Sequence, residues 1–135
     1  MEQFSGKKFK LIYSDNADIF MRAAGIDLGD MTKGLPIPTT VEVKKFHDTY
    51  VLITASPYKT IMQEFQSGNE FTVINETEPN EVKATITVTE HTLHEVLKFP
   101  SGRIAVADYI FTENDMRIIL NIDFIVAKLI YKRQT

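Results

Sequence analysis

Cysteine is absent from this chain of 135 residues. Its absence excludes disulfide scaffolds, thiolate nucleophiles and cysteine-based metal sites. Long apolar runs are absent as well, because no uninterrupted stretch approaches the ~18 residues that span a bilayer. The opening letters MEQFSGKKFK also lack the apolar core of a signal peptide. We therefore expect a cytoplasmic protein.

Basic residues are too few and too scattered for a surface that binds nucleic acid. The chain holds 15 lysines and arginines against 18 acidic residues, for a formal net charge of -3, and no basic run occurs. Hydrophobic residues make up 44% and charged residues 24%, the balance of a soluble globular protein. At this length we expect one domain, residues 1–135, that is a monomer.

Helical periodicity occurs near the N-terminus. Apolar residues at three- and four-residue spacing mark a first helix: Ala17, Phe20, Met21 and Ala24. This pattern ends at Gly25, as a short helix does. A second short helix is expected over residues 27–33, where Leu28 and Met31 share one side and Gly34 is the stop signal. Together the two helices would form a helix-turn-helix lid.

From Thr39 onward the chain consists of short runs rich in Val, Ile, Thr, Phe and Tyr, which predict strands. Turn-forming residues predict reversals at 46–48, 56–57, 67–69, 78–80, 90–91, 100–102 and 113–115. With an N-terminal strand over 7–13, about ten strands result, each antiparallel to the next. A sheet of that size removes its edges by closing. We expect a mainly β fold: a ten-stranded antiparallel up-and-down β-barrel whose interior holds a cavity capped by the lid.

Two-residue alternation predicts which side chains face the interior. In the closing stretch FIVAKLIYKR, one face carries Ile125, Ala127, Leu129 and Tyr131. The same parity turns these residues inward on the other strands: Tyr50, Leu52, Thr54, Ile61, Gln63, Phe65, Phe71, Val73, Leu93, Glu95, Leu97, Phe99, Tyr109, Phe111, Ile118, Leu120 and Ile122. Glu95 has two interpretations: it faces the cavity, or it is solvated or turned out beside a bulge. The first predicts one hydrogen-bonding set for a ligand head group or internal water: Tyr131, Tyr109, Gln63 and Glu95.

Three stretches resemble a known family: Phe4–Gly6, Asp15–Gly25 and Phe65–Phe71. The last, FQSGNEF, is similar to the F-x-x-G-x-E-F motif of the intracellular lipid-binding proteins, which include fatty-acid-binding proteins, bile-acid-binding proteins and cellular retinoid carriers. The stretches follow the family's order, and the resemblance covers nearly the whole chain. It implies a flattened ten-stranded barrel with a helix-turn-helix lid. It also implies a non-enzymatic cytosolic carrier of a fatty acid or related hydrophobic ligand.

The chain departs from the family at the cationic anchors. Members of the muscle and adipocyte type close with R-x-Y, in which Arg and Tyr hold the fatty-acid carboxylate. Here Tyr131 matches the Tyr, but Leu129 occupies the Arg position, and Tyr109 falls where the family has another internal Arg. A carboxylate buried without a cation or several donors would forfeit several kcal/mol. An anionic head is therefore expected near the mouth, and bile-acid, retinoid and neutral-lipid carriers remain alternatives.

The predicted ligand-binding residues are Tyr131, Leu129, Tyr109, Glu95, Gln63, Thr54, Leu120 and Phe65. The predicted portal residues are Met21, Ala24, Leu28, Met31 and Tyr58. The portal stripe has an alternative interpretation as helix-to-barrel packing. Arg22, Lys33 and Lys59 allow transient contact with anionic membranes, but their dispersion favours a merely solvated surface.

Signals for catalysis are weak. His47 and His91 lie in expected turns and His94 points outward, so solvated histidines are favoured over catalytic or metal-binding ones. Neither a phosphate-binding G-K-[ST] ending nor a G-x-S-x-G elbow occurs. We expect no enzyme activity, no cofactor and no metal. An isomerase or hydrolase acting in the cavity, and an interaction module using the lid surface, are the alternatives.

Overall fold

The computed structural model describes residues 1–23, 37–57, 60–73 and 82–134, with the backbone alone for Met21 and Val73. The helical elements are the 3₁₀ helix η1 (Glu2–Phe4) and the α-helix α1 (Ala17–Ala23). The strands are β1 (Lys8–Asp15), β2 (Thr40–Phe46), β3 (Thr49–Ala55), β4 (Thr60–Phe65), β5 (Glu70–Val73), β6 (Val82–Val88), β7 (Thr92–Lys98), β8 (Ile104–Phe111), β9 (Asp115–Ile122) and β10 (Ile125–Arg133). The expected second helix and the reversal at 78–80 lie outside the described residues.

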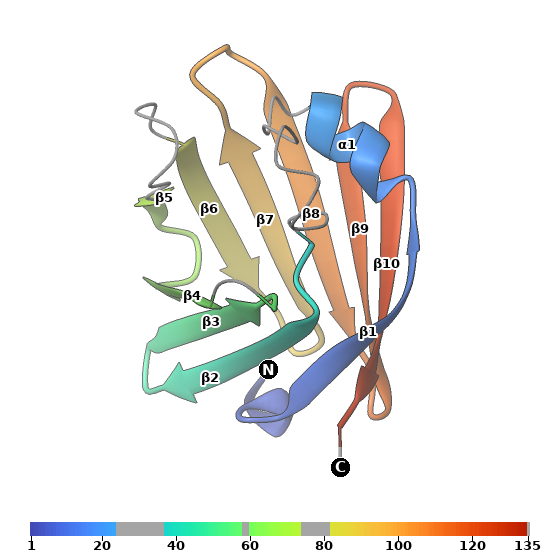
Figure 1. Cartoon of the computed structure of the whole chain (residues 1–135). Helices are drawn as coiled ribbons and strands as arrows, with labels where there is room; N and C mark the ends of the chain where they lie inside the picture. The colour runs from blue at the N-terminus through green and yellow to red at the C-terminus, as the bar shows by residue number, and fades with distance from the viewer. Residues whose placement is uncertain (24–36, 58–59, 74–81, 135) are drawn as a thin grey trace.

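The ten strands form one antiparallel sheet in the order β4-β3-β2-β1-β10-β9-β8-β7-β6-β5. Most consecutive strands pair with each other, and β1 pairs with β10 as well as with β2. The sheet therefore curls into a nearly closed barrel, in which the first and last strands lie side by side (Figure 1). This confirms the predicted ten-stranded antiparallel β-barrel.

The barrel differs from the sequence prediction at one seam, the line between β4 and β5. These strands end the sheet order, and no ladder joins their described residues. An aromatic contact crosses the seam instead: Phe65 of β4 stacks on Phe71 of β5 with centroids 6.0 Å apart. On its own side of the seam, Phe65 also stacks on Tyr50 of β3 with centroids 5.6 Å apart. The prediction that closure removes every edge is wrong here, because side-chain packing takes the place of backbone pairing.

Residues with positive φ mark the ends of several strands. Gly68 and Gly102 have φ values of +81° and +90°, which glycine adopts without a steric penalty. The two-residue turn at Asp123 and Phe124 is not among the predicted reversals, and Asp123 adopts a φ of 53° there. The register of β1 against β10 shifts just before Tyr13, so β1 contains a bulge that the alternation pattern did not predict.

Helix α1 lies at one end of the barrel, across β9 and β10 (Figure 1). Its residues Ala17 and Phe20 are buried, as the predicted apolar stripe requires. Arg103, from the β7–β8 turn, donates one hydrogen bond to the Ala23 carbonyl at the end of the helix and another to the Asp123 carboxylate at 2.7 Å. A cation is favourable at the C-terminal end of a helix. Arg103 thus ties α1 to two of the turns at this end.

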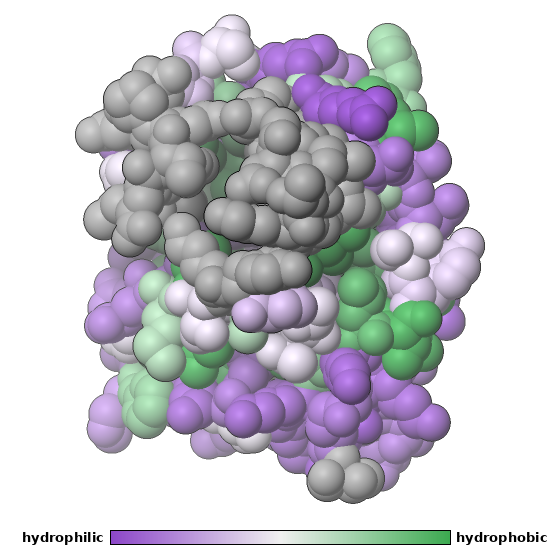
Figure 2. All heavy atoms as spheres, in the orientation of Figure 1, coloured by the Kyte–Doolittle hydropathy of each residue, from purple (hydrophilic) through white to green (hydrophobic). Residues whose placement is uncertain are grey.

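The outer surface mixes polar residues with exposed apolar ones such as Ile12, Met62 and Val126. Hydrophilic residues predominate along the lower edge of the face drawn in Figure 2, and apolar ones gather at the upper right, where the β9–β10 turn lies in Figure 1. Phe124 in that turn is fully exposed. Neither helix that the structure describes is long and apolar enough to cross a membrane.

Candidate functional site

Glu95 faces the interior of the barrel. It lies on β7 and is 6% exposed, and its partners in the sheet are the buried residues Ile86 on β6 and Ala107 on β8. The adjacent His94 points to the outer face, where its Nδ1 lies 2.5 Å from a carboxylate oxygen of Asp108. Of the two interpretations of Glu95, the structure therefore supports the one in which it faces the interior. His94 points outward, as predicted.

The inner face around Glu95 is apolar apart from two phenol groups. Its buried members come from β6 to β10: Ile86, Leu93, Ala107, Tyr109, Ile118, Leu120, Leu129 and Tyr131. All of these strands are joined by continuous ladders, so their inward-facing side chains form one surface. This half of the barrel offers a hydrophobic ligand a wall with a single carboxyl group in it.

Tyr109 is the polar partner of Glu95. Its Oη donates a hydrogen bond to Glu95 Oε1 over 3.5 Å, which is long for this kind of bond. Burial raises the pKa of Glu95 from 4.5 to about 7, and the bond from Tyr109 partly offsets that rise. Burial disfavours the ionised form because it removes bulk water from around the charge. Near neutral pH, protonated and ionised Glu95 are therefore both populated.

The second carboxyl oxygen of Glu95, Oε2, has no polar partner among the described residues. In the same part of the chain, no fully enclosed side-chain oxygen or nitrogen lacks a partner. Oε2 therefore borders space that a water molecule or a ligand can enter. This oxygen provides a hydrogen-bonding position within an apolar wall.

Tyr131 is fully buried, and its hydroxyl is already engaged. Tyr131 Oη donates a hydrogen bond to the backbone carbonyl of Pro38 at 2.7 Å. Burial raises the pKa of Tyr131 well above its ordinary value of 10.0. The pKa of Tyr109 is also raised, first by burial and then by its neighbours Glu95 and Tyr131. Both phenols therefore keep their protons at neutral pH, and the three side chains lie in one neighbourhood.

The other predicted ligand-binding residues lie around the barrel. The buried ones are Leu129, Leu120 and Phe65, and the half-buried ones are Thr54 and Gln63. Gln63 belongs to β4, opposite Leu52 of β3, and makes no hydrogen bond to Glu95. Of the predicted hydrogen-bonding set, the structure thus brings together Tyr109, Glu95 and Tyr131 but not Gln63.

The predicted portal falls largely outside the described residues. Met21 belongs to α1, where only its backbone is described. The remaining portal residues and two of the cations lie outside the described ranges: Ala24, Leu28, Met31, Tyr58, Lys33 and Lys59. Arg22 is exposed. The portal therefore stays a prediction.

No described cation lies in the interior. All arginines of the chain are described, and none is buried: Arg22, Arg103, Arg117 and Arg133. Among the described charged residues, only Glu42 and Glu95 are buried. Glu42 has a lysine nearby, since its carboxylate lies 3.8 Å from the Lys44 amine. The burial of Glu42 was not predicted, because nothing in the sequence distinguishes it from the acidic residues of other strands.

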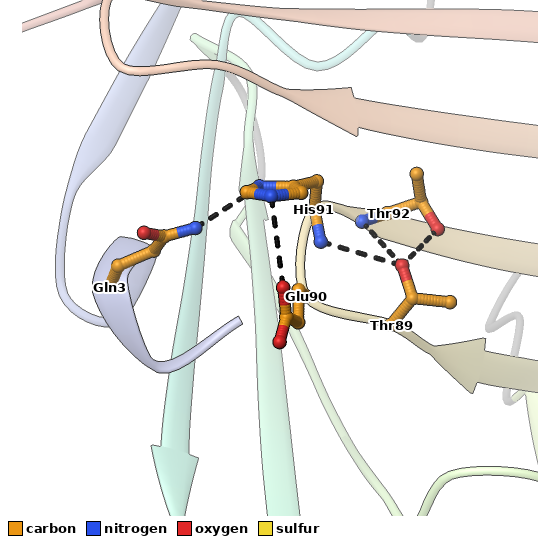
Figure 3. A network of polar contacts seen from close by, with 5 residues as sticks. All are labelled: Gln3, Thr89, Glu90, His91 and Thr92. Atoms are coloured by element: carbon orange, nitrogen blue, oxygen red, sulfur yellow. Dashed lines mark hydrogen bonds and ion pairs between the residues drawn. The ribbon is translucent and has the colours of Figure 1, made fainter.

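The histidines do not share a site. His47 occupies the β2–β3 turn with a φ of 55°, and His94 lies on the outer face. The His91 ring lies between two polar side chains, with Nδ1 3.1 Å from Gln3 Nε2 and Nε2 3.9 Å from Glu90 (Figure 3). These contacts tie η1 to the β6–β7 turn. Across the described residues, no three side chains of metal-binding type come together.

A groove of about 310 Å³ opens beside the seam. Its lining comes from both sides of the seam: Thr49, Glu64, Phe65, Gln66, Asn69, Glu70 and Phe71. The described lining of the groove thus contains carboxylates and no cation, so it favours an anionic group no more than the interior does.

Comparison with solved structures identifies the family, although no family model matches the chain. The fatty-acid-binding protein from Drosophila melanogaster brain is 33% identical, with a TM-score of 0.83 over 96% of this chain and 98% of its own. A Schistosoma mansoni fatty acid binding protein in complex with arachidonic acid is 25% identical, with a TM-score of 0.87 over 100% and 98%. Fatty-acid-binding protein 1 of Echinococcus granulosus is 21% identical over the whole of both chains, with a TM-score of 0.85, which shows the fold alone. The first identity extends over nearly the full length of both proteins, and this chain therefore belongs to the family of fatty-acid-binding and related intracellular lipid-binding proteins.

Proposed function

We propose that the protein is a non-enzymatic cytosolic carrier that holds a fatty acid or related hydrophobic molecule inside the barrel. One observation carries the proposal: the apolar inner face of β6 to β10 borders open space at Glu95 Oε2. Membership of a family of lipid carriers supports it. Binding of arachidonic acid by the Schistosoma protein of the same fold adds further support. We propose that the protein works as a monomer.

Burial of an alkyl chain supplies enough free energy for such a carrier. At roughly 0.8 kcal/mol per CH₂, about fifteen methylenes contribute on the order of 12 kcal/mol. Association costs roughly 4 to 15 kcal/mol. Micromolar binding needs about 8 kcal/mol, so the tail suffices only when that cost is near its lower limit. The polar head must therefore add little cost, which makes its chemistry decisive.

An enzyme acting in the same interior has less support. Glu95 is a candidate general base because its pKa is raised to about 7. Its hydrogen-bond partner is Tyr109, whose raised pKa keeps the phenol protonated rather than nucleophilic. No Ser, Thr or His among the described residues donates a hydrogen bond to Glu95. A carrier is therefore the better-supported function, and turnover of a bound lipid is the outcome that would favour the enzyme.

Ligand uptake tests this proposal. Native mass spectrometry of the purified protein should show an extractable lipid, and the delipidated protein should bind a fluorescent fatty-acid probe. Ala107→Phe places a ring on the inner face beside Glu95 and should weaken probe binding about tenfold, or roughly 1.4 kcal/mol. Val106→Phe is the matched control, because Val106 faces outward on the same strand and its variant should bind as the wild type does.

The competing functions give different results in the same experiments. Absence of an endogenous lipid together with no probe uptake would contradict the carrier. Conversion of a bound lipid into a product, lost in Glu95→Gln, would favour a cavity isomerase or hydrolase. Retention of a protein partner by a sample that takes up no lipid would favour an interaction module.

A further inference from the structure

The interior of the barrel is specific for the polar end of the ligand. We infer that the interior selects a neutral head group that donates a hydrogen bond, and that Glu95 accepts this bond through Oε2. The hydroxyl of a long-chain alcohol and the N–H of a long-chain amide are head groups of this class. The inference rests on the proposed carrier function and adds to it the chemical class of the ligand.

The geometry of Glu95 leaves one acceptor for a ligand. Oε1 already accepts the hydrogen bond of Tyr109, whereas Oε2 has no partner among the described residues and borders open space. A buried carboxyl oxygen is costly to leave without a donor. A ligand that brings a hydroxyl or amide N–H to Oε2 removes that cost, whereas a purely apolar ligand does not.

The described groups that face Glu95 carry no positive charge that would stabilise a second negative charge. On the elements packed against it, the described side chains are Ile86 of β6, Ala107 and Tyr109 of β8, Leu120 of β9 and Tyr131 of β10. The titratable members of this group are two phenols, which are neutral near pH 7 because burial raises their pKa. Among the described residues, a lipid carboxylate placed here would meet an acid and no cation.

Arg103, at the helical end of the barrel, is already engaged. It is exposed, and its guanidinium donates to the Ala23 carbonyl and to the Asp123 carboxylate. Moving it inward would break both contacts. Its present contacts therefore leave it unsuited to neutralise a carboxylate beside Glu95.

Protonation of Glu95 separates the two ligand classes. A lipid carboxylate can approach Oε2 only when Glu95 keeps its proton, so the binding of a fatty acid should weaken as pH rises. With a pKa of about 7, this coupling amounts to about a tenfold loss of affinity between about pH 6 and about pH 8. An alcohol or amide donates to either form, and more strongly to the ionised one. Its affinity should therefore stay constant or rise over the same interval.

The test compares ligands of one chain length in the delipidated full-length protein. Dodecanol, dodecanamide and dodecanoate are each used to displace a fluorescent probe at about pH 6 and about pH 8, where the charge of Glu95 differs. We expect dodecanol and dodecanamide to bind roughly ten times more tightly than dodecanoate at the higher pH, and the gap to narrow at the lower pH.

Glu95→Gln assigns the effect to this residue, because it keeps the shape of the side chain and removes its charge. The variant should bind dodecanoate with an affinity independent of pH and should lose most of the preference for dodecanol. Glu90→Gln is the control, because Glu90 lies in a turn with a side chain 91% exposed, and it should behave as the wild type does.

Either of two results would overturn the inference: dodecanoate binding as tightly as dodecanol at the higher pH, or a pH dependence that survives in Glu95→Gln. The wild-type comparison stands without any variant, so a folding defect in Glu95→Gln leaves the test intact. If none of the three ligands, dodecanol, dodecanamide and dodecanoate, binds, the proposed carrier function itself is wrong. Failure of the carrier function therefore gives a different result from failure of the inference about its head group.

Discussion

The two sides of the barrel bury their inner faces to different extents. Each strand from β6 to β10 is paired with a neighbour on both flanks. Inner residues of these strands, such as Leu93, are 0% exposed. From β3 to β5 the inward-facing Thr54 and Gln63 are half-buried, and Ile61 is 41% exposed. Isoleucine and leucine are equally apolar, so the residue type does not explain the difference. Ile61 lies on β4, which the seam leaves without a paired strand on one flank, whereas β7 is paired on both flanks.

The largest effect should come from truncating one apolar side chain on each side. Leu93→Ala removes a fully buried side chain and should lower the free energy of unfolding by about 2–5 kcal/mol. Ile61→Ala removes as many carbon atoms from a partly exposed position and should cost less than about 1 kcal/mol. Urea unfolding measures both. Equal losses would break the comparison between the two sides.

A somewhat smaller effect should follow from the charge of Glu95. Its pKa is raised from 4.5 to about 7, so between these values the folded protein holds a proton that the unfolded chain releases. The resulting stabilisation is complete below the lower value and is lost as pH rises through the upper one. The loss amounts to about 3 kcal/mol for this buried group.

Urea unfolding at about pH 5 and about pH 8.5 measures this loss, because these values lie on either side of the titration. Other groups titrate over the same interval, so the informative quantity is the difference between the wild type and Glu95→Gln. The variant should lose less stability than the wild type does between the two pH values. Identical losses would show that Glu95 is solvated in solution.

A third prediction separates the wall of the barrel from its ligand site. Tyr131→Phe removes the donor to the Pro38 carbonyl and should cost about 1–3 kcal/mol of unfolding free energy. Ligand affinity should change by less than about twofold, because the hydroxyl is already occupied. Tyr13→Phe, at an exposed position, is the control and should stay within about 0.5 kcal/mol of the wild type. Lost affinity at unchanged stability would assign the Tyr131 hydroxyl to the ligand.

The smallest effect is expected at the seam. Phe71→Leu keeps an apolar side chain but removes the ring that stacks on Phe65, and should cost about 0.5–1.5 kcal/mol. Amide hydrogen exchange should quicken in β4 and β5 while β7 to β10 keep their protection. Phe46→Leu, on an exposed ring outside the stack, is the control. Faster exchange throughout the sheet would mean that the two sides unfold as one unit.

Much of the fold follows from local patterns in the sequence. In β9 the inward-facing Ile118, Leu120 and Ile122 are all buried, as strict alternation predicts. The reversal at 67–69 contains Gly68, whose positive φ explains why the chain turns there. The turn at Asp123 and Phe124 was missed because Phe124 is apolar and extends the strand pattern. Asp123 supplies the left-handed conformation, which aspartate tolerates better than most residues do.

The candidate site was harder to predict, because its contacts join distant parts of the chain. Alternation gives the parity of Glu95 but does not say whether it is solvated. That depends on the register that sets Leu93 opposite Tyr109. The bond from Tyr131 to Pro38 spans 93 residues and ends on a backbone carbonyl, which no side-chain pattern reveals. The unpaired seam likewise depends on how far the whole sheet curls.

The seam separates β4 and β5, which are consecutive in the sequence but not paired. Conversely, β1 and β10 are paired although they lie at opposite ends of the sequence. Lys8 and Gln134 are hydrogen-bonded at 2.8 Å, and both termini lie at the same end of the barrel (Figure 1). A circular permutant opened in the turn at 66–69 and spliced through its present ends would therefore run from β5 round to β4 with every paired strand adjacent in sequence. The most distant pairing in the fold would become a hairpin, and the lower contact order should make the permutant fold faster than the parent.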